Sequence, residues 1–269
     1  MIRTDLTNKQ YHEVDAISST DAKAVVLSTI YHWHHQERRE TPAMQKGTAV
    51  HDFALEGGNN TVCGPETRRG NAWKDAVAEA GDKLLLPEAE YFECQSIAAA
   101  LRADPACAKQ LDHPSALQEN SLFATCYGDT LKVKARPDSY NPDDFIMSDV
   151  KVTVDPSPTG FVREIYKYRY DVQAAFYKYV ASLVGWEIAQ FAFLAVSNTK
   201  PYVAHLHVMS LESMKRGETD MFKALDQIAE AKQNNSYTTG WPRFSMAYPP
   251  SWMTEWGSTS QPQKETKDG

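Results

Sequence analysis

The sequence predicts an α/β fold with a mixed central β-sheet flanked by helices, and with a helical elaboration at its N-terminal end. Three observations predict it: helical patterns dominate residues 18–103, short runs of strand composition fill residues 121–152 and 188–208, and two long amphipathic helices are interleaved with those strands. No segment is rich enough in proline, glycine or serine to divide the chain. We therefore expect a single domain over residues 1–256 and a disordered polar tail over residues 257–269, where no large apolar side chain occurs.

The N-terminal helices are predicted from their apolar spacing and their end signals. Ser18, Ser19, Thr20 and Asp21 have the composition of a helix start, and apolar residues follow them at helical spacing. A loop is expected over residues 57–71, and further helices over residues 47–55, 72–80 and 87–103. The last of these ends near Asp104-Pro105, because the residue before a proline disfavours helical backbone.

The strands are predicted from composition and alternation. A three-stranded meander is expected over residues 121–127, 130–136 and 145–152, with its first turn at Gly128-Asp129. In the middle run, apolar residues alternate with Lys132, Lys134 and Arg136, which predicts a half-buried strand with one basic face. The rest of the pattern predicts a helix over residues 161–184 that is broken near Tyr170, strands over 188–196 and 202–208, and a helix over 211–233.

Composition and charge exclude several classes of protein. The 269 residues include 28 Lys and Arg against 35 Asp and Glu, with an ordinary apolar fraction, so collagen-like, coiled-coil and wholly disordered chains are excluded. No apolar stretch is long enough to span a membrane, and no secretory signal opens the chain, so no membrane partner is expected. Four scattered cysteines without a CxxC pair predict a reduced, cytoplasmic protein with no iron–sulfur cluster. The net charge of −7 lowers the expectation of nucleic-acid binding without excluding it, since a nuclease needs only a local basic groove.

The most informative residues are Asp138, at the end of one predicted strand, and Asp149 and Lys151 in the next. Neighbouring strands lie about 4.8 Å apart, so the two carboxylates can share a cation, and oxygen ligands suit Mg²⁺ or Mn²⁺. Lys151 shares a strand face with Asp149 and can stabilise the charge that develops during attack on phosphorus. The alternative is an ordinary salt bridge at the edge of a sheet.

Two further motifs add to this group. Gln173 and Tyr177, four residues apart in QAAFY, share one helix face and point to a polar cleft or to solvent. His51, in GTAVH, follows a flexible glycine on a helix. Taken singly, each also fits a structural role: a surface glutamine, an interface tyrosine and a structural histidine.

Four short motifs occur in the order found in the PD-(D/E)XK nuclease superfamily: GTAVH, RPD, DVK and QAAFY. More narrowly, the chain resembles the RecE-like exonucleases (exonuclease VIII type), which are relatives of the RecB nuclease domain, from about Ser18 to about Trp252. The resemblance implies a restriction-endonuclease-like core. It also implies a metal site made by His51, Asp138 and Asp149, with Mg²⁺ bound and Mn²⁺ as a substitute.

The same resemblance assigns the remaining site residues. Lys151 would be the catalytic lysine, Gln173 and Tyr177 would line the site, and Glu119 would hold a second metal or the nucleophilic water. Asp149 stands where many members of the superfamily have Glu, and the ligand chemistry is preserved. For DNA binding, the sequence offers six basic residues, each of which also fits a solvated surface: Arg68, Arg69, Lys74, Arg136, Arg163 and Lys167.

The resemblance implies a 5′-to-3′ exodeoxyribonuclease that degrades one strand of linear double-stranded DNA and leaves 3′ overhangs for recombination. It implies no ATP requirement, and no GxxxxGK[ST] loop is present. It further implies a ring-shaped homo-oligomer, a tetramer, and a partner of the RecT type that anneals single strands. The setting would be the cytoplasm of a bacterial host, with the gene from the host, a prophage or a phage.

Two alternatives remain open. One is a Cas4-like nuclease that cuts single-stranded or flap DNA, against which the lack of clustered cysteines counts. The other is a non-catalytic DNA-binding or assembly subunit on the same fold, against which the presence of Asp138, Asp149 and Lys151 counts.

Overall fold

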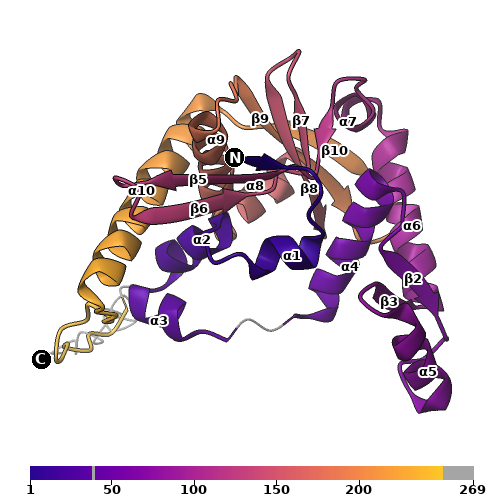
Figure 1. The fold of residues 1–269 in the computed structure, drawn as a ribbon, viewed down its shortest axis with the longest axis horizontal. Helices are drawn as coiled ribbons and strands as arrows, with labels where there is room; N and C mark the ends of the chain where they lie inside the picture. The colour runs from indigo at the N-terminus through magenta and orange to yellow at the C-terminus, as the bar shows by residue number, and fades with distance from the viewer. Residues whose placement is uncertain (38–39, 251–269) are drawn as a thin grey trace, which may run out of the picture.

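A computed structural model describes residues 1–37 and 40–250 (Figure 1). Its strands are β1 (Ile2–Arg3), β2 (Thr61–Gly64), β3 (Leu84–Pro87), β4 (Leu117–Gln118), β5 (Ser121–Cys126), β6 (Leu131–Ala135), β7 (Ser139–Asn141), β8 (Ile146–Thr153), β9 (Gln190–Ser197) and β10 (Ala204–Val208). They form a five-stranded sheet in the order β10-β9-β8-β7-β4, a three-stranded sheet in the order β1-β5-β6, and the parallel pair β2-β3. The predicted tail over residues 257–269 lies outside the described residues.

The helices are α1 (Asn8–Glu13), α2 (Ser19–Leu27), α3 (Ile30–His35), α4 (Pro42–His51), the π-helix η1 (Asp52–Glu56), α5 (Gly70–Ala80), α6 (Glu88–Ala103), α7 (Pro105–Leu111), α8 (Pro158–Lys167), α9 (Tyr170–Leu183) and α10 (Leu211–Asn234). Local signals explain several of their ends. The backbone N–H of Ser18 donates to the Asp21 carboxylate at 2.7 Å, so α2 begins where the sequence predicted. The predicted break near Tyr170 is confirmed, because Arg169 adopts a left-handed φ of 53° between α8 and α9.

The five-stranded sheet is mixed, as predicted. β8 and β9 are parallel, with Asp149 opposite Phe193, whereas β9–β10, β7–β8 and β4–β7 are antiparallel. Because a parallel connection needs a long crossover, α8 and α9 lie between β8 and β9 in the sequence. β8 is therefore an interior strand with neighbours on both sides.

Both faces of this sheet are covered, and side chains alternate between two hydrophobic clusters. On β9, Phe191 and Phe193 join one cluster, with residues of α2, α8, α9 and α10. Leu194 and Val196 join the other, with residues of α4, α6 and α7. Figure 1 shows α9 and α10 on one side and α4 and α6 on the other. The predicted α/β class with flanking helices is confirmed.

Several element predictions were wrong. The predicted meander does not form, because β6 pairs with β5 in the three-stranded sheet, whereas β8 pairs with β7 and β9. β7, β2 and β3 were missed, since runs of three or four residues carry too little alternation to be recognised. The helix expected over residues 47–55 begins earlier, at Pro42, and its last part is π-helical. α6 ends just before Pro105, as predicted, but Pro105 also begins α7, which was not predicted. The Asp104 side chain caps α7 by accepting hydrogen bonds from the N–H groups of Ala106 and Cys107.

The basic face predicted for β6 is mostly covered. Lys132 is exposed, but Lys134 is buried and donates to the carbonyl oxygens of Tyr11, His12 and Val14. These carbonyls lie at the C-terminal end of α1 and just beyond it, where a cation is favoured. Lys134 therefore anchors the N-terminal segment beside β6. Within the described residues, no helix has both the length and the apolar character needed to cross a membrane.

Candidate active site

A cleft of about 910 Å³ lies between the N-terminal segment and the end of α4, and its lining includes His51, Glu119, Arg136, Asp138 and Tyr177. Asp138 precedes β7, Glu119 follows β4, and His51 ends α4. Buried carboxylates without partners are strongly unfavourable, so the contacts that each one makes indicate what the cleft holds.

His51 and Asp138 meet beside the backbone of β8. The Nδ1 of His51 lies 3.3 Å from the Oδ2 of Asp138, and its Nε2 lies 3.1 Å from the carbonyl oxygen of Val150. The N–H of Val150 donates to the Asp138 carboxylate at 2.5 Å. Burial alone would lower the pKa of the imidazole, but Asp138 raises the pKa of His51 to about 9. Burial likewise opposes the charge of Asp138, and His51 nevertheless holds the Asp138 pKa below its ordinary value.

Glu119 completes a group of possible metal ligands. One ligand atom from each of His51, Glu119 and Asp138 lies within 4.8 Å of the others. Glu119 has a left-handed φ of 54°, an uncommon conformation for a residue other than glycine, and its N–H donates to the carbonyl oxygen of Asp138. Burial and the charge of Asp138 raise the pKa of Glu119 to about 7. An imidazole and two carboxylates form a donor set that fits Mg²⁺ or Mn²⁺.

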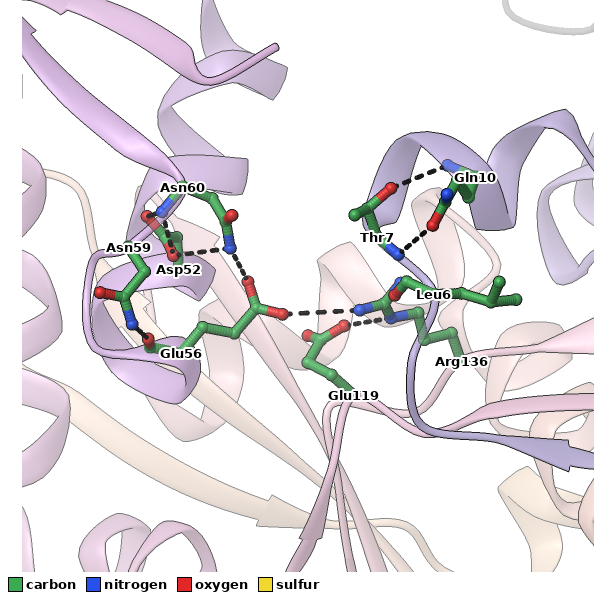
Figure 2. A network of polar contacts seen from close by, with 9 residues as sticks. All are labelled: Leu6, Thr7, Gln10, Asp52, Glu56, Asn59, Asn60, Glu119 and Arg136. Carbon is green, nitrogen blue, oxygen red and sulfur yellow. Dashed lines mark hydrogen bonds and ion pairs between the residues drawn. The ribbon is translucent and has the colours of Figure 1, made fainter. Parts of the chain in front are cut away.

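Arg136 holds Glu119 from the other side (Figure 2). Its Nε donates to Glu119 at 2.6 Å, a second nitrogen donates to the Leu6 carbonyl oxygen, and a third lies 3.5 Å from Glu56. Glu56 ends η1 and accepts a hydrogen bond from Asn60 at 2.7 Å. The π-helix thus brings a second carboxylate to this guanidinium, and π-helical turns are frequent at functional sites. Arg136 was predicted to contact DNA, but the structure buries it in this network.

Asp149, Lys151 and Gln173 form a second group. The Lys151 ammonium forms an ion pair with Asp149, and the Nε2 of Gln173 donates to the Oδ1 of Asp149 at 2.8 Å. Burial and the charge of Asp138 raise the pKa of Asp149. Burial lowers the pKa of Lys151, but the charge of Asp149 outweighs this effect and raises the Lys151 pKa above its ordinary value. Both oxygens of Asp149 therefore have partners within the protein. The candidate ligand group found among the described residues contains Glu119 and not Asp149, so the role of Asp149 as a metal ligand stays a prediction.

Tyr177 and Lys23 lie near this group. Tyr177 lines the cleft, and burial raises its pKa well above the ordinary value, so its phenol stays neutral. Lys23, on α2, donates to the Oε1 of Gln173 at 3.2 Å. Burial and the charge of Lys151 lower the pKa of Lys23 to about 8. Sequence reasoning missed Lys23, because nothing in its surroundings distinguishes it from a solvent-exposed lysine.

The remaining predicted DNA-binding residues lie on two separate elements. Arg68 pairs with Glu90 at 2.9 Å. Arg69, which caps the start of α5, and Lys74, inside that helix, are both exposed. Arg163 and Lys167 are exposed on α8. In Figure 1, α5 lies at the lower right beside β3, and α8 lies near the centre. Their role in DNA binding stays a prediction.

A family of known proteins matches most of the chain. Residues 18–240 match the family described as a PDDEXK-like domain of unknown function (DUF3799). The chain belongs to this family. The prediction of a PD-(D/E)XK fold is thereby confirmed, and the match includes every residue predicted for the metal and catalytic site. Domains of this type generally depend on a divalent metal, and in this PDDEXK-like domain His51, Glu119 and Asp138 are the candidate ligands.

A solved structure shows the same fold. A proposed exonuclease from Eubacterium rectale superposes with a TM-score of 0.62 at 15% identity, over 95% of this chain and 100% of that one. A phage-related exonuclease from Haemophilus somnus gives a TM-score of 0.38 at 11% identity, over 82% of this chain and 96% of that one. No curated protein matches the chain.

Proposed function

We propose that this PDDEXK-like protein is a metal-dependent exodeoxyribonuclease that degrades one strand of linear double-stranded DNA from 5′ to 3′ without ATP. One observation carries the proposal: the acidic group His51–Glu119–Asp138 and the Asp149–Lys151–Gln173 group meet at β8, through the peptide of Val150. A structural salt bridge would not need an imidazole, two buried carboxylates, a half-buried carboxylate and a lysine close together.

The residues have distinct roles in phosphodiester hydrolysis. His51, Asp138 and Glu119 would hold the divalent cation, with Asp149 beside them. When bound, Mg²⁺ or Mn²⁺ supplies Lewis-acid stabilisation of the charge on the phosphate. Lys151 positions the attacking water and stabilises the negative charge that develops as water attacks phosphorus. Gln173 fixes the Asp149 carboxylate, and the neutral Tyr177 phenol offers a hydrogen bond within the cleft.

The resemblance to RecE-like exonucleases supports three parts of the proposal: the direction of digestion, the assembly and the partner. We propose a ring-shaped tetramer that encircles DNA, and a single-strand annealing protein of the RecT type that takes up the 3′ strand. The cytoplasm of a bacterial host, or of a cell carrying the phage, is the setting that fits this role. Exposed Arg69, Lys74, Arg163 and Lys167 would contact the DNA backbone without reading its sequence.

A strand-specific digestion tests the proposal. Linear duplex DNA, labelled at one 3′ end and carrying a 5′ phosphate or a 5′ hydroxyl, is incubated without ATP in Mg²⁺ and then in EDTA. We expect shortening from the 5′ end that EDTA abolishes. Cleavage of single strands or flaps with the duplex intact would replace the proposal by the Cas4-like alternative, and folded, metal-loaded protein that cuts no DNA would leave the non-catalytic one.

A further inference from the structure

Lys23 is joined to the catalytic group by one side-chain amide. Its Nζ donates to the Oε1 of Gln173 at 3.2 Å, and the Nε2 of the same amide donates to Asp149 at 2.8 Å. α2 and α9 pack in the same hydrophobic cluster, so this contact is set by the fold and not by a flexible loop. Lys23 therefore has a fixed place beside Asp149 and Lys151.

The two lysines also share one aromatic ring. The Nζ of Lys23 lies 5.3 Å from the centroid of Tyr170, and that of Lys151 lies 5.0 Å from the same centroid. Ring faces attract cations, but two like charges on one ring repel one another. Two ammonium groups are thus gathered next to one carboxylate, Asp149.

The two lysines differ in their ion-pair partners. Lys151 is paired with Asp149. Among residues 1–37 and 40–250, no carboxylate lies within ion-pair distance of Lys23, whose side chain is half-buried. A partly desolvated ammonium without a counter-ion is unfavourable, and an arriving anion removes that penalty. A phosphodiester carries one negative charge and strong acceptor oxygens, which match an ammonium that has no ion-pair partner.

We propose that Lys23 is a second phosphate-binding lysine, which contacts a non-bridging oxygen of the cleaved strand beside Lys151. The inference rests on the proposed nuclease function and deepens it by assigning a residue that the catalytic motifs do not contain. Gln173 then has two tasks: it orients Asp149, and it holds Lys23 in place until the phosphate arrives. A purely positioning role, in which Lys23 only fixes Gln173, is the competing explanation.

The salt dependence of DNA binding separates these two roles. Each phosphate contact by a lysine adds about 0.9 to the slope of log K against log salt for duplex DNA. We would measure binding of a labelled linear duplex to the full chain in Ca²⁺, over a series of salt concentrations, together with kcat and KM in Mg²⁺. The variants are Lys23→Met and Lys23→Arg, with Lys109→Met as the control, because Lys109 is an exposed lysine on α7, far from α2 in the fold.

We expect Lys23→Met to lower the slope by about 0.9 and to reduce kcat/KM at least tenfold. Lys23→Arg should keep the slope and most of the activity, and Lys109→Met should change neither. If Lys23→Met lowers activity while the slope stays unchanged, Lys23 only positions Gln173 and the proposal is wrong. If the wild-type protein neither binds nor cuts DNA, the nuclease function itself fails, and the assignment of Lys23 fails with it. Circular dichroism checks that each variant is folded.

Discussion

The side-chain amide of Gln173 donates to the Oδ1 of Asp149 at 2.8 Å, across 24 residues of sequence. The orientation of this amide follows from its two neighbours. Its nitrogen faces a carboxylate, which only accepts, and its oxygen faces the Lys23 ammonium, which only donates. The opposite orientation would place like against like on both sides, so the contact with Asp149 is fixed by the charges around it.

Lys151→Ala and Asp149→Ala should fold and lose cleavage. Each removes a group that acts on the reacting phosphate or its metal, so we expect single-turnover rates to fall by at least about 10²–10³-fold. Near-normal cutting by either variant would contradict the site assignment. Far-ultraviolet circular dichroism and thermal unfolding, measured beside the wild type, show whether the fold is retained.

Metal binding should strengthen as pH rises from about 6 to about 9. A ligand atom binds metal only without its proton, and the raised pKa values of Glu119, about 7, and His51, about 9, mean that both retain protons at lower pH. Mn²⁺ binding should therefore release protons near neutral pH. Isothermal titration calorimetry in two buffers with different ionisation heats measures that release.

His51→Gln is the control for this pH dependence. Without the imidazole, the proton release that belongs to His51 should disappear. The release that belongs to Glu119 should remain and move to higher pH, because the charge of His51 lowers the Glu119 pKa. An affinity for Mn²⁺ that does not change with pH in the wild type would exclude these two residues as ligands.

Lys23→Met should stabilise the metal-free protein at pH 7. The folded pKa of Lys23, about 8, lies below its ordinary value of 10.5. The unfolded chain therefore holds this proton more tightly, and the resulting destabilisation is fully present below pH 8 and disappears as pH rises towards 10.5. Removing the charge should raise the free energy of unfolding by about 1–2 kcal/mol, less than the full pKa shift gives, because water reaches part of the side chain.

Urea denaturation at pH 7 measures this difference, and Lys109→Met provides the matched surface control, for which we expect a change below about 0.5 kcal/mol. A Lys23→Met variant that is less stable than the wild type would mean that the contact with Gln173 outweighs the desolvation of the ammonium.

Gly217→Ala should weaken the packing of α10 against α9. A Cβ at residue 217 would lie 2.2 Å from the carbonyl oxygen of Asp171, on the backbone of α9, so one helix must shift. We expect a loss of about 1–3 kcal/mol in the free energy of unfolding. Gly47→Ala is the control: Gly47 lies within α4, a Cβ there meets nothing within 4 Å, and alanine favours the helix by about 1 kcal/mol. Equal effects of the two substitutions would contradict the close approach of α9 and α10.

Periodicity and short motifs were enough to predict what lies along a single element. The alternation on β8 places Asp149 and Lys151 on one face, and the four-residue spacing on α9 places Gln173 with Tyr177. The contact of Lys151 with Asp149 follows from the shared face of β8. Both are local properties, so the sequence carries them directly.

What covers a face could not be predicted. Lys134 and Arg136 alternate with apolar residues as surface residues do, but the N-terminal segment, more than 100 residues earlier, lies over them and supplies their carbonyl partners. The contact of Lys23 with Gln173 likewise joins residues that are 150 positions apart. Such contacts depend on how elements pack together, which no local pattern encodes.

The two hydrophobic clusters lie on opposite faces of the central sheet, and each positions part of the candidate active site. His51 is carried by a helix of one cluster and Gln173 by a helix of the other, and both side chains contact β8. In a newly made or damaged molecule, one of the two layers can lose its packing against the sheet. Such a molecule would keep most of its helices but would have no complete active site. The proposed cleavage of DNA would then be confined to molecules in which both layers are packed, and loss of activity on mild heating would precede the loss of helical signal.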